Sequence, residues 1–510
     1  MDHQSFHQFL DRFIPEVEHR SKQLNKATWI LETTSLPDAA DLRAELDAEV
    51  RLLFQDPKIY QELIKWDQDP SLSDPLLKRQ LNVLIRQFKS NQLPKELIQE
   101  IAKREAILTS SYGNFRAQMD GEFYSENGLR QILTHEQDPV RRKKAWEASK
   151  QIGEELAPQI LELVKLRNQG AQSLGYSDYF EMQLDLQEVD RAWLLKIFEE
   201  LSEKSKDAYT QELKEIEKVL SDRFGEAAPW SWSDPFCQED PLASSLDNLV
   251  SDVDIVASCI NYYRKAGFDV EPVLQKSDLY ERSGKSQHAF CTHIDRRGDV
   301  RTLNNIKSSM RWLETLLHEL GHAVYELGFD HKLPWLLREP PHMIPTEAMA
   351  LLAGRQAYRS DSLQKLTGKV DPEAEKSLRR RQLIFSRWVM VMTAFESELY
   401  RDPSQDLNAL WWKLVEQIQM IHPPKGREGK ADWAAKMHIG LAPVYYFSYL
   451  LGELFASSLQ QEIKDFSSPE AGEFLQNKLF APGNCWSWDQ LVCHVTGKPL
   501  STDAWIQEFA

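Results

Sequence analysis

Apolar side chains recur every three or four residues through most of the chain, with charged residues between them. Four stretches show this spacing at length, namely residues 44–66, 92–108, 139–176 and 190–220. Because apolar side chains at this spacing share one face of a helix, the pattern predicts amphipathic helices. We therefore expect a mainly α fold.

One region interrupts the helical spacing. The runs GKSQHAFCTHI, DRRGD and VRTLNNI predict a short strand, a turn at Gly298 and a second strand. Another irregular run, EAAPWSWSDPFCQEDPL, is rich in proline and aromatic residues and is expected to be a loop that packs between lobes. The predicted β-element lies directly before the helix that carries the most informative residues.

The charge balance of the chain restricts its partners. The 510 residues include 61 Lys and Arg against 78 Asp and Glu, a formal net charge of −17. This excess of acid argues against nucleic acid as a partner. The apolar runs are too short to span a membrane, and the first residues lack a signal-peptide pattern. Five scattered cysteines without a CxxC pair favour a reducing compartment, so we expect a cytoplasmic protein.

The run SSMRWLETLLHELGHAVYELGF predicts a buried helix with a candidate metal site. His318 and His322 are four residues apart, so both imidazoles lie on one helical face and can reach one ion. Glu319 is displaced to the side of that face, where it is a poor ligand but can hold a water on the ion. The alternative is a pair of core histidines that are hydrogen-bonded to carbonyl groups. The HExxH spacing favours one Zn²⁺ per chain.

A third ligand is expected because catalytic zinc usually takes three protein ligands and keeps one open position. In PPHMIPTEAMALL a helix is predicted to start at Pro345 and Thr346, which puts Glu347 in its first turn. His331 and His342, in the preceding loop, are the alternatives. Spacing alone favours Glu347 without excluding the two histidines.

The run HELGHAVYELGFDHKLPWLLREPPHMIPTEAMALL resembles the zinc-site segment of two related metallopeptidase groups, the thimet oligopeptidase/oligopeptidase F family and the angiotensin-converting enzyme family. The resemblance implies a two-lobed helical metallopeptidase with a deep central cleft, a small β-element lining that cleft, and Glu347 as the third zinc ligand. Similarity extends from about Ala145 to the end. It implies a single peptidase unit over residues 1–510, with a helical lid region, 1–105, and a catalytic region, 106–510.

A third matching run is KMHIGLAPVYYFSYLLGEL, which on its own is also compatible with aromatic residues at the edge of a core. The resemblance implies that His438 and Tyr449 stabilise the transition state. It also implies that Lys436 and Tyr446 hold the C-terminal carboxylate of the substrate. Tyr445 remains an alternative to Tyr446, because the gap from the histidine is one residue longer than in the converting enzyme.

Other positions agree with this family pattern or depart from it. His288 and Ala289 match a His-Ala pair that binds the substrate backbone. A glutamine that helps to hold the carboxylate is expected near Trp232, and none occurs there. Leu351 stands where an aspartate would support a zinc histidine. The partners of the two histidines are therefore not predicted.

Motif and resemblance together predict zinc-dependent hydrolysis of peptide bonds in short peptides, with a water at the zinc activated by Glu319. One alternative is a peptidyl-dipeptidase that releases C-terminal dipeptides. Lys436 and Tyr446 favour this alternative, whereas the missing glutamine favours an endopeptidase. An alternative of another class is a non-catalytic helical scaffold stabilised by zinc. Neither nucleic acid nor a membrane is expected as a partner, and the oligomeric state is left open.

Overall fold

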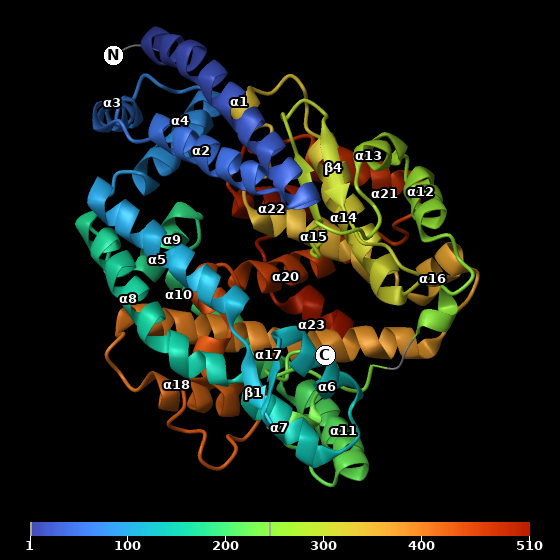
Figure 1. Ribbon diagram of the computed structural model, residues 1–510. Helices are drawn as coiled ribbons and strands as arrows, with labels where there is room; N and C mark the ends of the chain where they lie inside the picture. Colours follow the sequence, from blue (N-terminus) through green and yellow to red (C-terminus); the bar gives the residue numbers. More distant parts are fainter. Residues whose placement is uncertain (1–2, 244–245) are drawn as a thin grey trace. The chain divides into compact units, whose positions relative to one another are not determined.

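The computed structural model describes residues 3–243 and 246–510, and these residues are mainly helical (Figure 1). The prediction of a mainly α fold is confirmed. The described residues form two compact units, each built from segments that are far apart in the sequence. Unit 1 takes the described parts of Met1–Gln92, Ser245–Glu375 and Leu451–Ser501, and unit 2 takes those of Leu93–Ser244, Lys376–Leu450 and Thr502–Ala510.

Helices make up most of both units. Those of unit 1 are α1 (His3–Thr34), α2 (Pro37–Leu53), α3 (Pro57–Asp67), α4 (Pro75–Ser90), α12 (Ile255–Lys265), α13 (Glu271–Lys276), α14 (Met310–Leu327), α15 (Met343–Arg355), α16 (Ser360–Thr367), α21 (Pro469–Phe474) and α22 (Trp488–Thr496). Those of unit 2 are α5 (Lys95–Asn114), α6 (Glu126–His135), α7 (Pro139–Ser149), α8 (Gln151–Ser173), α9 (Tyr179–Leu186), α10 (Arg191–Lys204), α11 (Lys206–Phe224), α18 (Leu407–Leu414), α19 (Met437–Leu441) and α23 (Asp503–Phe509). The unit boundaries fall near the start of α17 (Pro372–Arg401) and within α20 (Phe447–Glu462).

The predicted helical stretch 44–66 is split between α2 and α3. The break between the two helices ends at Asp56, whose side chain caps α3 by accepting a hydrogen bond from the Lys58 N–H at 2.8 Å. Pro57 follows at the first helical position, where its missing N–H costs nothing. Asp74 caps α4 in the same way. Local capping chemistry therefore sets where these helices begin.

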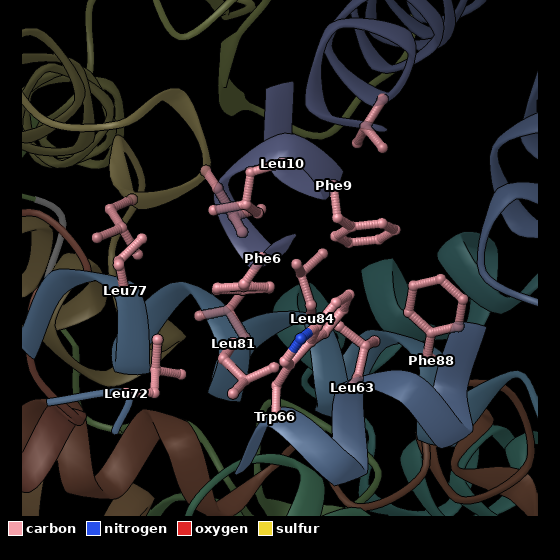
Figure 2. Packing of buried hydrophobic residues seen from close by; sticks show 14 of the residues in the cluster. Phe6, Phe9, Leu10, Leu63, Trp66, Leu72, Leu77, Leu81, Leu84 and Phe88 are labelled. Carbon is pink, nitrogen blue, oxygen red and sulfur yellow. The ribbon is translucent and has the colours of Figure 1, made fainter. Parts of the chain in front are cut away.

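The helices at the start of unit 1 share an aromatic core. Phe6 and Phe9 of α1 point toward Trp66 of α3 and toward Leu84 of α4 (Figure 2). The side chains of Phe6 and Leu84 are fully buried. Burial of each large apolar side chain contributes about 1.5–3 kcal/mol, so this cluster ties α1, α3 and α4 together. The predicted lid region, 1–105, extends past residue 92, where unit 1 gives way to unit 2, and its role as a lid stays a prediction.

Two short antiparallel hairpins are present. The predicted one pairs β3 (Phe290–His293) with β4 (Val300–Leu303), and Gly298 lies in its turn with φ +106°. The other pairs β1 (Ala117–Met119) with β2 (Glu122–Tyr124) around an Asp-Gly turn. The prediction of a single β-element is wrong, because three-residue strands carry too little alternation to detect.

The structure also bears on the predicted loop, on membrane spans and on the cysteines. The loop predicted at residues 226–242 is confirmed, since it contains only one short 3₁₀ turn, Pro229–Ser231. None of the described helices is both long enough and apolar enough to cross a membrane. The five cysteines are not paired with one another. The cytoplasmic location stays a prediction.

Candidate functional site

Three side chains of unit 1 converge at the contact between α14 and α15. His318 and His322 lie on α14, Glu347 lies on α15, and one potential ligand atom from each lies within 4.8 Å of the others. His318 Nε2 is 3.8 Å from Glu347 Oε2. In the part of the chain that the structure describes, this is the one group of three such residues with metal-binding geometry. The convergence expected from spacing and resemblance is therefore present.

Small residues allow α14 and α15 to approach each other closely. A Cβ added to Gly321 would lie 2.8 Å from the Ala350 Cα and 3.2 Å from the Ala353 Cβ. A larger side chain would force the two helices apart, because packed cores have little free volume. The glycine in HELGH thus keeps the histidines within reach of Glu347.

The two alternative histidines take other places. His342 is the N-cap of α15, and its Nδ1 accepts a hydrogen bond from the Ile344 N–H at 3.0 Å. This cap starts the helix at Met343, two residues before the predicted start, so Glu347 falls in the second turn rather than the first. His331 is exposed and lies outside the converging group. Of the three candidates, the fold brings Glu347 to the histidine pair.

Burial disfavours charge on all three residues of the group. It lowers the pKa of His318 to about 4 and that of His322 well below its usual value. It raises the pKa of Glu347 to about 7, and the negative charge of Glu453 adds to this rise. Neutral imidazoles offer their lone pairs to a metal ion. A bound divalent cation would supply the positive charge that this buried carboxylate lacks.

Glu319 is buried beside this group without an evident structural role. Its Oε2 atom has no hydrogen-bond partner among the described residues. Burial raises the pKa of Glu319 to about 8, and the charge of Glu347 raises it further. Leaving a buried carboxyl oxygen unpaired costs free energy, so such atoms call for an explanation. Two imidazoles, one carboxylate and an unpaired acid fit a metal ion with a water to be activated.

Thr346 is a site residue that the sequence did not reveal. His322 Nδ1 lies 2.7 Å from Thr346 Oγ1, and an imidazole that donates through Nδ1 keeps the lone pair of Nε2 for a metal. The resemblance had suggested an aspartate at position 351, which is Leu351 here. The hydroxyl group instead comes from the neighbour of Glu347 in the sequence.

Replacing Thr346 by valine should weaken zinc binding by about 10–100-fold, the usual effect of removing a partner of a ligand histidine. Valine keeps the shape of threonine but cannot accept the hydrogen bond. Zinc affinity is measured by competition with a chelator of known affinity. Thr346→Ser is the control, because it keeps the hydroxyl group and should bind zinc nearly as well as the wild type. Equal affinity in the valine variant would exclude this role.

The β3–β4 hairpin packs against the metal-site helix within unit 1. Ala323 and Leu327 of α14 belong to one hydrophobic cluster with Val300 of β4 and Cys291 of β3. The far edge of β4 is occupied, since the Asp278 N–H donates to the Thr302 carbonyl at 3.1 Å. Among the described strands, β3 pairs only with β4. The other edge of β3 carries no described strand, and Asn25 of α1 donates to the His293 carbonyl there at 3.2 Å.

His288 and Ala289 directly precede β3. His288 is exposed and Ala289 is half-buried. Lys285 fixes the segment before them, because its buried ammonium donates to Asp278 Oδ1 at 2.8 Å and to the carbonyls of Asp278, Tyr280 and Asn304. Sequence reasoning did not identify Lys285, since only the folded loop brings these oxygens together.

Lys436 in unit 2 has a glutamine neighbour, Gln238. Its Nζ donates to Gln238 Oε1 at 3.1 Å and lies 5.6 Å from the centre of the Tyr446 ring. Trp232, near which the glutamine was expected, is 2% exposed. No glutamine lies at that position, and the loop instead brings Gln238, six residues later, to the lysine.

The loop that presents Gln238 is held rigidly within unit 2. Arg142 is buried and donates to three loop carbonyls, those of Trp230, Ser231 and Trp232. The buried Asp234 carboxylate accepts three loop N–H groups, those of Phe236, Gln238 and Glu239. Hydrogen bonds to charged groups contribute about 1.5–3 kcal/mol each. These bonds therefore hold the loop that carries Gln238 in one conformation.

The predicted aromatic residues of unit 2 form one cluster. The rings of His438 and Tyr446 are 5.0 Å apart, and those of Tyr446 and Tyr449 are 5.5 Å apart. Tyr446 is 6% exposed and lies against Lys436, whereas Tyr445 is half-buried. The contact with Lys436 supports Tyr446 over Tyr445 as the partner of the lysine.

Comparisons with known proteins find similarity to angiotensin-converting enzymes. A family model described as "Angiotensin-converting enzyme" (Peptidase_M2) matches residues 1–226. An angiotensin-converting enzyme of Haematobia irritans exigua is 23% identical over 461 residues, which cover 78% of this chain and 73% of that protein. The matched range 1–226 begins well before Ala145, from which the resemblance was expected to extend. It ends before His318, so the family match and the metal-site geometry are separate observations.

Proposed function

We propose that the protein is a zinc-dependent peptidase in which His318, His322 and Glu347 hold one zinc ion. The convergence of these three side chains within 4.8 Å carries the proposal. The unpaired Oε2 atom of Glu319 beside them supports it, because a purely structural zinc site has no need of an additional acid. Similarity to angiotensin-converting enzymes is consistent with this chemistry.

In this mechanism different residues of the chain have different roles in hydrolysis. A zinc ion at this site would act as a Lewis acid that polarises the peptide carbonyl and lowers the pKa of water toward about 7. Glu319 takes the proton of the attacking water and delivers it to the leaving amine. From the resemblance we further propose that His438 and Tyr449 donate hydrogen bonds to the developing oxyanion.

We propose that the substrate binds along the edge of β3 that carries no described strand. An extended peptide can add to a sheet edge through backbone hydrogen bonds, which give affinity with little sequence selectivity. We propose that His288 and Ala289 make such contacts at the start of the strand, as the resemblance implies. Short peptides of varied sequence are the expected substrates.

A second candidate function is the release of C-terminal dipeptides. The contact of Lys436 with Gln238 favours it, since a cation and an amide beside a tyrosine can together bind a carboxylate. We call Lys436, Gln238 and Tyr446 the carboxylate-binding group. Its presence removes the main objection to a peptidyl-dipeptidase, and an oligopeptidase that cuts inside short peptides remains the alternative subtype. Membership of the thimet oligopeptidase/oligopeptidase F family stays a prediction.

The carboxylate-binding group should make binding depend on pH. Burial lowers the pKa of Lys436 to about 8, although the nearby Asp234 opposes this effect. The ammonium is therefore present below pH 8 and is lost as the pH rises through that value. KM for a peptide with a free C-terminus should rise by about 10–100-fold when this charge is lost. KM for the same peptide with an amidated C-terminus should stay level, whereas parallel pH curves for the two peptides would contradict the role of Lys436.

The proposed function is tested by mass spectrometry of the products formed from a mixed peptide pool, with and without a zinc chelator. Chelator-sensitive loss of C-terminal dipeptides supports the peptidyl-dipeptidase, and internal cuts in both free and amidated peptides support the oligopeptidase. A protein that contains zinc but leaves every peptide intact would instead be the non-catalytic scaffold.

A further inference from the structure

Val444 has a backbone conformation that β-branched residues rarely adopt. Its φ is +57°, in the left-handed region, where a branched side chain crowds the backbone. It lies in the turn between α19, which carries His438, and α20, which begins just after Tyr446. Such conformations persist only where the surrounding structure holds them, and they are concentrated at functional sites.

Two side chains of unit 2 form hydrogen bonds with the backbone of Val444. Glu396 Oε1 on α17 accepts a hydrogen bond from the Val444 N–H at 2.9 Å. Gln187 Nε2, at the end of α9, donates to the Val444 carbonyl at 3.2 Å. Glu396 is only 2% exposed. A buried carboxyl group is costly unless hydrogen bonds compensate for its lost hydration, so an acid at this position requires a role that an apolar residue could not fill.

The backbone conformation of Val444 affects where Tyr446 lies. Because φ and ψ are the only soft torsions of a residue, φ at Val444 sets the direction in which the chain enters α20. Tyr446 follows two residues later and lies against both His438 and Lys436. A change of φ at Val444 would therefore move Tyr446 away from these two neighbours.

We propose that Glu396 and Gln187 are positioning residues that lock the Val444 turn and so keep Tyr446 in the carboxylate-binding group. This inference rests on the proposed function, because it assigns the two residues to the binding of a substrate carboxylate. Neither residue touches the substrate in this mechanism. Both act through the backbone of the turn.

The test compares Glu396→Gln with Glu396→Met. The two side chains have similar length, but only glutamine keeps an oxygen that can accept from the Val444 N–H. For a peptide with a free C-terminus, E396M should raise KM by about tenfold with little change in kcat, the signature of lost ground-state binding. E396Q should behave like the wild type, and KM for the amidated peptide should not change in either variant. Thermal unfolding of both variants shows whether they are folded.

A second substitution separates positioning from a general packing defect. Glycine adopts a left-handed φ without the cost of a Cβ, so Val444→Gly should relieve the need for Glu396. The double variant E396M/V444G should regain most of the binding that E396M loses. The proposal is overturned if E396M binds as well as E396Q, or if the double variant is as impaired as E396M.

Hydrogen exchange tests the same turn without any substrate. The amides of Ala442 and of residues 444–447 should exchange faster in E396M than in E396Q, because only E396M releases the Val444 N–H. This readout remains valid if the wild type cleaves no peptide. In that case the proposed function is wrong, but the exchange rates still show whether Glu396 stabilises the turn. Equal exchange in the two variants would overturn the positioning role whatever the enzyme activity.

Discussion

Replacing Glu319 by glutamine is expected to lower kcat by about 10²–10⁴-fold, the usual contribution of a general base, while one zinc ion stays bound. Glutamine has the shape of glutamate but cannot take the proton of the attacking water. Zinc should remain because its three proposed ligands are His318, His322 and Glu347. The measurements are kcat on a fluorogenic peptide and metal content by mass spectrometry.

The fold should tolerate this substitution. Glutamine has the same size as glutamate and is uncharged, so it can occupy this buried position without the cost of burying a charge. Thermal unfolding of the zinc-loaded variant should therefore stay close to that of the wild type. Peptidase activity near the wild-type level in a folded, zinc-loaded E319Q variant would show that another residue is the base.

The second large effect is expected from Glu347→Gln, which should remove most of the bound zinc and the activity with it. An amide cannot supply the negative charge of the carboxylate, and only two imidazoles remain. A catalytic metal contributes several kcal/mol to transition-state stabilisation. Loss of about 4 kcal/mol corresponds to roughly a 10³-fold fall in kcat/KM. Zinc content after dialysis and kcat/KM at saturating zinc are the two measurements.

A matched control is Glu271→Gln in the same unit, where the glutamate forms an exposed ion pair with Arg264. Exposed ion pairs contribute little, so this variant should keep both zinc and activity. If E347Q instead retained zinc and differed from the wild type no more than E271Q does, Glu347 would not be a ligand.

Helical periodicity was enough to predict most of the fold. Residues 190–220 were expected to be helical from this spacing, and they form α10 and α11. The breaks at Lys150 and Ser205, each between two long helices, carry no glycine or proline signal and were not predicted. The β1–β2 hairpin was also not predicted, although its Asp120-Gly121 turn is a recognisable hairpin sequence.

The candidate site was predictable only as far as neighbours in the sequence determine it. His318 and His322 share a helical face, so their pairing follows from spacing alone. Glu347 came from the resemblance, and the structure brings it to the pair. Thr346 and Gln238 were missed because their contacts depend on how a helix and a loop pack in three dimensions. No periodicity or motif encodes such contacts.

The metal centre is tested most directly by X-ray absorption at the zinc edge of the purified, reconstituted protein. We predict one zinc per chain with only nitrogen and oxygen ligands, at about 2.0–2.2 Å, two of them histidines. The E347Q variant should lose this signal, and E319Q should keep it. Sulfur at about 2.3 Å, or no stoichiometric zinc in the wild type, would contradict the assignment of His318, His322 and Glu347 as the ligands.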